Sequence, residues 1–522
     1  MAEALDTFWT SPKKIISKIS KEFRLAFLSA CFIGVIIHLY AFSNLLINHD
    51  GIVSLWSENE HLASGRWALH FFSCFSGSYE LPVVIGLLSI LALAVSAGLT
   101  VRVLRLTHPV AIVLTAGLLV SFPVTACIFS YLFTADAYFI ALLLTSLTAY
   151  VAQYIDAAGK RSTRLVLVLI SAVCLAVSSG IYQAFIGYAV GLLLFDCILR
   201  LLERAPVRQV IKTGVRYLLI ILLGLVLYVI VLQILLRVRH VELTTYRNMD
   251  QAFSFSPRAY LAAIPSIYRD FWRYFWYVQY FDGKWIAIPR LILICSATLG
   301  CTSLAACRRE EAFPVRLFLV LSGVILTPLA VSFISVITRN TGIYELMQYS
   351  YILIYIFAVK LAELCGKSLI PEPFRAQRAV ALVSLLLCGA FIWNSLCITN
   401  KVYLRMQICM ENTTAWANRI VTQIEALPGY TPETPVAFVG SSSTYGKYNA
   451  FWGPDNFSSV SSVNHMNWYT GNTILYRLLS RRPAFLPSPL LGTVLAIFPH
   501  TALQTVFGIH CQMSFVNLGD AT

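Results

Sequence analysis

Residues 81–101 read LPVVIGLLSILALAVSAGLTV and contain no charged side chain. Wound as an α-helix, a run of this length covers the roughly 30 Å of hydrocarbon in a lipid bilayer. Similar blocks recur along the chain, which is 58% hydrophobic and 12% charged, with a mean hydropathy of +0.72. Soluble domains carry about 25% charged residues. The sequence therefore predicts a polytopic α-helical membrane protein.

Eleven apolar blocks are long enough to cross a bilayer and together define a transmembrane domain over residues 25–400. The predicted spans are 25–46, 81–101, 109–130, 137–155, 165–183, 186–203, 217–238, 285–306, 317–337, 349–366 and 379–399. Residues 1–24 combine apolar residues and lysines at helical spacing, and no cleavage-site pattern follows. We predict an amphipathic helix on the cytoplasmic leaflet rather than a signal peptide.

Basic residues fix the predicted orientation of these spans. They gather in alternate connections, such as the one with Lys160, Arg161 and Arg164, whereas the short loops of the opposite face contribute only Arg66 and Arg339. Positively charged loops stay in the cytoplasm. This places the amino terminus in the cytoplasm and the tail beyond residue 400 on the far side. A basic rim facing anionic lipid also explains the net charge of +14 without a nucleic-acid partner.

Polar sequence collects on the outer face, in loops 47–80 and 239–284 and in a tail over residues 401–522. The tail predicts a small soluble α/β domain, with a helix over 403–426 and a buried strand over 435–440. The run 489–510 is apolar enough for a twelfth span, but its proline and polar residues argue against one.

Most of the 13 cysteines lie in apolar spans and behave there as small hydrophobic residues. Cys409 and Cys511 fall in the outer tail. A disulfide between them and a pair of buried free thiols are equally compatible with the sequence. No CxxC pair or His/Cys cluster predicts a structural metal.

The first outer loop holds the most informative polar residues. Asp50 follows the first span directly, and an acidic group at a membrane boundary is costly enough to require a functional reason. Arg66 follows in the same loop. A carboxylate can accept a proton from an attacking hydroxyl, and a guanidinium can stabilise a departing phosphate. The pair suits transfer from a lipid-borne phosphate to a hydroxyl, although outer-face arginines also bind lipid headgroups for structural reasons.

A second group of polar residues lies at other outer ends of the spans. Asp136 is predicted either to assist the acceptor or His49, or to cap the following helix. Arg339 is a second candidate for phosphate binding. Tyr182 and Gln183 can hydrogen-bond to a sugar or stack on it, although tyrosine is also common at membrane boundaries.

The stretch 268–282 carries an aromatic residue on nearly every turn and predicts a helix at the membrane interface. The favoured interpretation is an aromatic belt that anchors the protein. The alternative is a wall of the donor cavity, with Arg247, Arg269 or Arg273 near the donor phosphate.

Together these segments resemble a known family, the type II serotype-converting glucosyltransferases of bacteria and their phages, which have the GT-C fold. The resemblance covers the whole chain, its span count and outer tail included. It is carried by the acidic residue after the first span, Gly65-Arg66-Trp67, Phe133-Thr134-Ala135-Asp136-Ala137-Tyr138 and Ser179-Gly180-Ile181-Tyr182-Gln183-Ala184.

The resemblance implies an enzyme of the bacterial inner membrane. The donor would be glucose linked to undecaprenyl phosphate, a polyprenyl phosphate, and the acceptor lipid-linked O-antigen of lipopolysaccharide on the periplasmic face. It further implies a functional link to the membrane proteins that synthesise and flip the donor. Asp50 would be the general base. Many relatives carry a second acidic residue beside it, where this chain has His49, a substrate-binding candidate.

The predicted reaction is a single displacement at the anomeric carbon with inversion of configuration. Because the outer loops offer only scattered carboxylates, we predict catalysis without a metal or other cofactor. Three other functions are compatible with a polytopic chain. A polysaccharide polymerase would not need Asp50, and a flippase or transporter would show broken helices and repeated halves. A non-catalytic scaffold gives no reason for Asp50.

Overall fold

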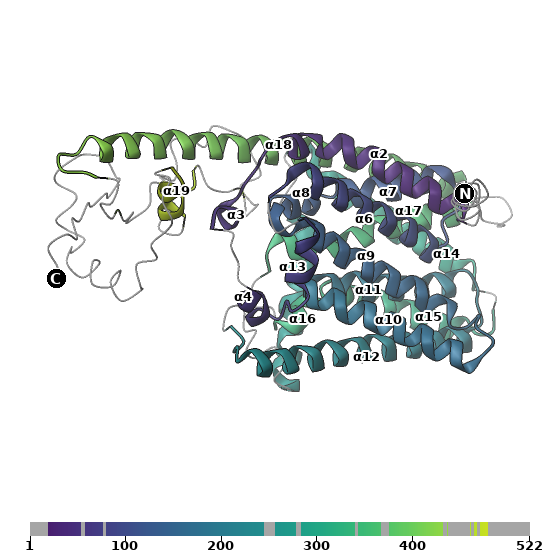
Figure 1. The fold of residues 1–522 in the computed structure, drawn as a ribbon. Coiled ribbons are helices and arrows are strands. Elements are labelled where there is room, and N and C mark those ends of the chain that lie inside the picture. Colours follow the sequence, from purple (N-terminus) through teal and green to yellow (C-terminus); the bar gives the residue numbers. More distant parts are fainter. Residues whose placement is uncertain are drawn as a thin grey trace, which may run out of the picture. The chain divides into compact units, whose positions relative to one another are not determined.

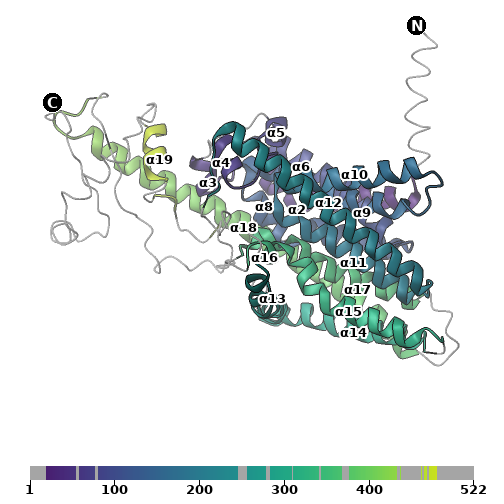
Figure 2. The same ribbon diagram turned by 90° about the horizontal axis from the view of Figure 1, so that it is seen from below.

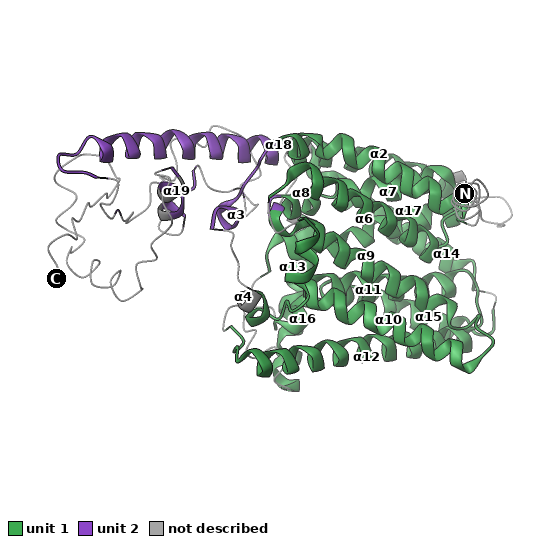
Figure 3. Cartoon of the chain, in the orientation of Figure 1, with its two compact units in different colours: residues 1–44, 57–129, 133–400 green, residues 45–56, 130–132, 401–522 purple. Residues whose placement is uncertain are grey.

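The computed structural model describes most of the chain. The described residues are 19–53, 58–76, 80–244, 256–277, 283–308, 310–339, 343–366, 375–431, 436, 460, 464–466 and 470–478. Within these ranges every regular element is a helix (Figure 1). The chain divides into two compact units: unit 1 contains residues 1–44, 57–129 and 133–400, and unit 2 contains residues 45–56, 130–132 and 401–522 (Figure 3).

Unit 1 is a helical bundle. Its helices are α2 (Lys21–Ser43), α4 (Glu58–Ala63), α5 (Leu69–Ser73), η1 (Cys74–Ser76), α6 (Pro82–Val103), α7 (Pro109–Ser121), α8 (Pro123–Phe129), α9 (Leu132–Tyr154), α10 (Arg161–Ile181), η2 (Gln183–Phe185), α11 (Ile186–Leu202), α12 (Val207–Arg239), α13 (Pro257–Tyr277), η4 (Gly283–Ile286), α14 (Ala287–Ala305), α15 (Phe313–Val331), α16 (Phe333–Ile337), η5 (Glu345–Tyr351), α17 (Ile352–Gly366) and the first half of α18 (Arg375–Glu425). Helices α10, α11 and α12 contact one another and lie side by side in both views (Figures 1 and 2).

The predicted spans fall on these helices. In the described part of the chain, ten helices are long and apolar enough to cross a membrane, and the bent pair α7–α8 makes an eleventh. The bend of 41° between α7 and α8 follows from Pro123. A residue before proline is pushed out of the helical region, and Phe122 accordingly has ψ 130°. The polytopic helical architecture expected from the sequence is therefore confirmed.

Small residues bring the helices of unit 1 close together. A Cβ atom added to Gly86 of α6 would lie 2.4 Å from the ring of Phe42, and one added to Gly98 would lie 2.5 Å from the ring of Phe23. Both phenylalanines belong to α2, so its aromatic rings rest directly on the α6 backbone. Such small-residue contacts are typical of helices that pack within a bilayer.

Short helices lie outside the long apolar spans. The first outer loop forms α3 (His49–Val53), α4 and α5. The aromatic stretch lies in α13, which ends at Tyr277. Its buried Phe275 stacks with Tyr351 of η5, and its buried Phe271 makes an edge contact with the same ring. Trp272 is 53% exposed.

Unit 2 contains α3, the second half of α18 and α19 (Gly471–Leu478). The helix predicted over 403–426 is present as the end of α18. No strand occurs among the described residues of this unit. The strand expected at 435–440 lies outside the described residues except for Val436, and so do the run 489–510 and most of the amphipathic segment 1–24.

Candidate active site

Arg66 lies on two stacked aromatic rings at one end of the unit 1 bundle. Its Nη1 donates a hydrogen bond to the Tyr138 hydroxyl at 3.2 Å, and its Cζ lies 5.3 Å from the centroid of the Tyr182 ring. The rings of Tyr138 and Tyr182 are 4.3 Å apart and nearly parallel, and both residues are buried. A planar guanidinium gains from such stacking, so the cluster holds a positive charge in a defined position.

The turn that presents Arg66 is fixed by its backbone. Gly65 has a φ of 76°, a conformation that glycine adopts without strain. The Arg66 N–H donates to the His61 carbonyl, and the Ala68 N–H donates to the Gly180 carbonyl, both at 2.8 Å. A Cβ atom on Gly180 would lie 2.4 Å from the Trp67 indole. The Gly-Arg-Trp segment therefore docks on the end of α10.

The Gln183 side chain stabilises the same turn through hydrogen bonds. Its amide nitrogen contacts the Ser64 carbonyl and the Tyr228 hydroxyl, each at 3.1 Å, and the Tyr228 hydroxyl donates to the Gly65 carbonyl at 3.0 Å. Both predicted residues therefore lie near Arg66. The Tyr182 ring contacts its guanidinium, and the Gln183 side chain hydrogen-bonds to the backbone of its turn. Their binding to a sugar stays a prediction.

His61 keeps a neutral ring beside this cluster. Burial lowers the pKa of His61 to about 4, and the nearby charges of Arg66 and His70 act in the same direction. At neutral pH the ring therefore adds no second positive charge next to the Arg66 guanidinium.

Asp136 lies fully buried in the second turn of α9. Its Oδ1 accepts a hydrogen bond from the Ala137 N–H at 2.8 Å, and the Ser76 side chain interacts with the same carboxyl group. Its Oδ2 makes no hydrogen bond of normal length among the described residues. The expectation that Asp136 caps the helix is wrong, because α9 begins four residues earlier at Leu132. A buried carboxylate oxygen without a partner is costly, so Asp136 stays a candidate for contact with a substrate.

The remaining predicted phosphate ligands are Arg339 and Arg247. Arg339 follows α16 with a φ of 51°, and its Cζ lies 5.1 Å from the ring centroid of Tyr260 in α13. Arg247 lies outside the described residues.

In unit 2, Asp50 sits in the first turn of α3. Its side chain is 19% exposed, and its Oδ1 lies 3.5 Å from the Nε2 of His49, whose side chain is 31% exposed. The Asn48 side chain caps the helix by accepting a hydrogen bond from the Gly51 N–H at 2.8 Å. The His49 ring makes an edge contact with Tyr131, with centroids 6.3 Å apart. The carboxylate is therefore partly exposed and lies next to an imidazole.

Two residues of these clusters were not singled out from the sequence. Tyr138 lies within the segment Phe133–Tyr138, but nothing in that segment indicated its contact with Arg66, 72 residues away. His465 gave no signal at all, although its ring lies 6.4 Å from that of His49. Among the described residues, no group of three or more His, Cys, Asp or Glu side chains is placed to hold a metal ion.

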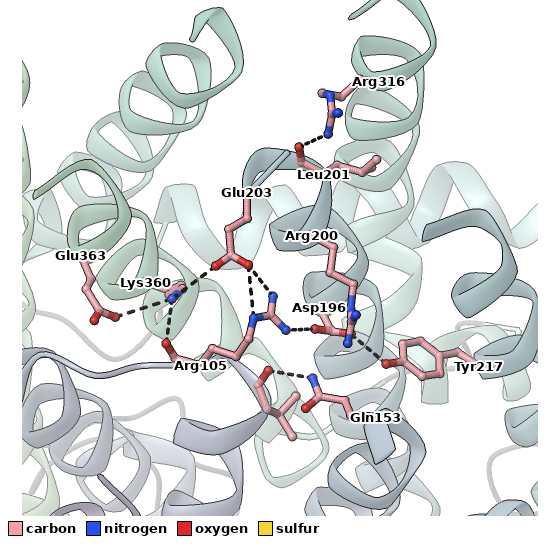
Figure 4. Close-up of polar contacts among 11 residues, drawn as sticks. Arg105, Gln153, Asp196, Arg200, Leu201, Glu203, Tyr217, Arg316, Lys360 and Glu363 are labelled. Atoms are coloured by element: carbon pink, nitrogen blue, oxygen red, sulfur yellow. Dashed lines mark hydrogen bonds and ion pairs between the residues drawn. The ribbon is translucent and has the colours of Figure 1, made fainter. Parts of the chain in front are cut away.

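A second polar cluster of unit 1 involves α11, α12 and the connection between α6 and α7 (Figure 4). Asp196 of α11 is fully buried. Its carboxylate accepts hydrogen bonds from Arg105, from the Arg200 Nε at 2.7 Å and from the Tyr217 hydroxyl at 2.8 Å. Glu203 binds Arg105 at 3.0 Å. This cluster ties α11 to α12 and to the α6–α7 connection.

The same cluster extends to α17. Lys360 lies 3.6 Å from Glu203 and 3.7 Å from Glu363. The Glu363 Oε1 also accepts hydrogen bonds from the backbone N–H groups of Thr107 and His108, both at 2.9 Å. Each carboxylate of this cluster therefore faces a cation within the protein itself, which marks the cluster as structural.

Comparison with known proteins gives one match. The family model described as Glucosyl transferase GtrII matches residues 39–355, a region that includes α3, the Arg66 turn and the first turns of α9. No curated protein and no solved structure is significantly similar to the chain.

Proposed function

This chain belongs to the GtrII glucosyltransferase family, and we propose that it moves glucose from undecaprenyl-phosphate glucose to lipid-linked O-antigen on the periplasmic face of the bacterial inner membrane. The observation that carries the proposal is the family match over residues 39–355. The ten long apolar helices of the described chain support a lipid-borne donor. The orientation follows from the basic connections, with the amino terminus cytoplasmic and the tail periplasmic.

We propose that Asp50 is the general base. Its carboxylate takes the proton of the acceptor hydroxyl while the hydroxyl oxygen attacks the anomeric carbon of glucose. The bond between that carbon and the phosphate oxygen breaks, and undecaprenyl phosphate leaves with the bonding electrons. A single displacement inverts the anomeric configuration. His49, 3.5 Å from Asp50, would hold the carboxylate and contact the acceptor.

We propose that Arg66 neutralises the departing phosphate. Its guanidinium is held against Tyr138 and Tyr182, and a preorganised cation stabilises charge that develops in the transition state. Tyr182 and Gln183 would hold this arginine in place at the substrate site, because Tyr182 contacts its guanidinium and Gln183 hydrogen-bonds to its turn. Arg339 and Arg247 are further candidates for the phosphate.

Asp136 would bind the acceptor through its Oδ2. This oxygen is buried and makes no hydrogen bond among the described residues, so a substrate hydroxyl would supply the partner that it lacks. The role differs from that of Asp50, because a fully buried carboxylate exchanges protons with water less readily than a partly exposed one.

The test supplies the purified protein with undecaprenyl-phosphate glucose, labelled in the sugar, and lipid-linked O-antigen. We expect labelled O-antigen whose new glycosidic bond has the anomeric configuration opposite to that of the donor, with the same yield in the presence of a chelator. Product with retained configuration would contradict the single displacement. If neither glucose nor any other lipid-linked sugar is transferred, the proposal fails, and the polymerase and flippase hypotheses take its place.

A further inference from the structure

The helix that carries His49 and Asp50 is too short to be stable alone. It comprises five residues, His49–Val53, and helices of fewer than about 12 residues are marginal in water without tertiary contacts. Its single cap, the Asn48 side chain, fixes one backbone group. The position of the Asp50 carboxylate therefore depends on what α3 packs against.

The packing partners of α3 come from the C-terminal part of the chain. Ile47 and Ile52, on either side of Asp50, belong to a hydrophobic cluster of unit 2. The other buried members of that cluster are Ala417, Ile420, Ile424, Val436, Met466, Ile474 and Leu475. Helices α3 and α19 are also in direct contact. More than 350 residues of sequence separate the two sides of this cluster.

His465 is the polar member of this contact. It is 3% exposed, and its Nε2 lies 3.4 Å from the Cys409 Sγ of α18. Its backbone N–H donates to the Thr413 Oγ1 at 2.9 Å, and that hydroxyl donates to the Cys409 carbonyl at 2.7 Å. The residue is thus fixed on α18 from its backbone and from its ring.

The ring of His465 lies near that of His49, with centroids 6.4 Å apart and planes tilted by 46°. Burial lowers the pKa of His465 to about 4, and the charge of His49 adds to this effect, while a hydrogen bond with the Ile47 backbone opposes it. At neutral pH His465 is therefore an uncharged ring next to His49.

We propose that the C-terminal part of unit 2 positions the proposed base, and that His465 is a positioning residue acting through His49 on Asp50. The inference rests on the proposed role of Asp50. In this role the tail need not contact either substrate. Without the tail, α3 would lose the apolar surface on which its conformation depends.

The first test is a double-mutant cycle in the glucose-transfer assay. We expect His465→Ala to lower kcat about tenfold and to leave the KM for undecaprenyl-phosphate glucose unchanged. In a His49→Ala background the same change should add nothing further, because the ring through which it acts is gone. If the two losses multiply, His465 does not act through His49 and the proposal is overturned. Val402→Ala, a buried truncation in α18 outside the hydrophobic cluster, should change kcat by less than about twofold.

The second test needs no substrate and separates this inference from the proposed function. Hydrogen exchange is measured on the peptide spanning residues 45–53 in wild type, His465→Ala and Val402→Ala. Faster exchange of this peptide in His465→Ala alone supports the positioning role, even if the wild type transfers no glucose. Equal exchange in wild type and His465→Ala overturns the inference, even if glucose transfer is confirmed.

Discussion

Two fully buried aspartates among the described residues of unit 1 differ in their hydrogen bonding. Asp196, in the last turns of α11, has both carboxylate oxygens engaged, by Arg105 on one side and by Arg200 and Tyr217 on the other. Asp136, in the second turn of α9, uses Oδ1 for a backbone N–H, whereas Oδ2 makes no hydrogen bond among the described residues. A carboxylate whose partners are all internal stabilises the fold. One that lacks a partner is available to a substrate.

The two aspartates also lie in different neighbourhoods. Asp196 belongs to a cluster of alternating cations and carboxylates that joins α11, α12 and α17. The turn between α4 and α5 instead places Arg66 over the ring of Tyr182 and next to the Tyr138 hydroxyl. We therefore expect substitutions at the first cluster to change stability and substitutions near Arg66 and Asp136 to change activity.

The largest expected effect on stability is that of Asp196→Asn. The change removes the fully buried carboxylate that Arg105 and Arg200 share, although these two side chains are 33% and 23% exposed. Breaking a buried ion pair costs up to about 3–5 kcal/mol. Thermal unfolding in detergent should show a large fall in melting temperature. Asp156→Asn is the matched control, because Asp156 pairs with Arg216 but its side chain is 41% exposed, so a loss of at most about 1 kcal/mol is expected. Equal effects of the two changes would contradict the structural role of the Asp196 cluster.

The next effect is on activity. Arg66→Lys keeps the positive charge but loses the planar group that stacks on Tyr182 and reaches Tyr138, and lysine does not replace arginine at such sites. We expect kcat/KM for the donor to fall about 30-fold, which corresponds to about 2 kcal/mol, with little change in melting temperature. Arg290→Lys is the control, since Arg290 also lies over an aromatic ring, that of Trp276, and should retain activity. A fully active Arg66→Lys protein would exclude the proposed phosphate contact.

Asp136→Asn should have the opposite outcome to Asp196→Asn, with activity lost and stability kept. The amide has the same shape and a lower cost of burial, so stability should be equal to or above that of the wild type. Glucose transfer should fall about tenfold if a substrate hydroxyl donates to Oδ2. The glucose-transfer rate and the melting temperature are measured on the same preparation of the Asp136→Asn protein. Lost stability with intact activity would assign Asp136 to the structure, as for Asp196.

The smallest expected effect is a pH dependence of stability from His61. Its folded pKa of about 4 lies below the ordinary value near 6.5. As pH falls from about 6.5 to about 4, the unfolded chain binds a proton that the folded chain does not, so stability decreases across this window and not further below it. The slope contributed is at most about 1.4 kcal/mol per pH unit. As the pH is lowered, the melting temperature of His61→Gln should fall less steeply than that of wild type. Identical slopes would contradict a neutral, buried His61 ring.

The sequence predicts the helices better than their contacts. Spans such as 81–101 follow from hydropathy alone, since a bilayer demands about 20 apolar residues in a row. The break at Pro123 was not expected, because α7 and α8 form one uninterrupted apolar block. The expected strand at 435–440 rests on a local apolar pattern, and the structure describes only Val436 of it.

At the candidate site, the sequence indicates individual residues and misses their neighbours. Asp50 is indicated by the cost of an acidic group at a membrane boundary, and Arg66 by the ability of a guanidinium in the same loop to stabilise a phosphate. The contacts of Arg66 with Tyr138 and of His49 with His465 join residues that are distant in sequence. Local periodicity carries no information about such pairs. The Asp196 cluster was missed for the same reason, as Arg105 and Asp196 are 91 residues apart.

The most direct test of the proposed mechanism compares Asp50→Asn with the wild type in transfer of labelled glucose from undecaprenyl-phosphate glucose, at matched protein levels. Asp270→Asn, at a 41% exposed aspartate of α13, is the control for the loss of one carboxylate. We predict that Asp50→Asn lowers kcat by about a hundredfold or more, as expected for the loss of a general base, while Asp270→Asn transfers at the wild-type rate. Equal rates for all three proteins would contradict the role of Asp50 and place the base at Asp136 or another residue.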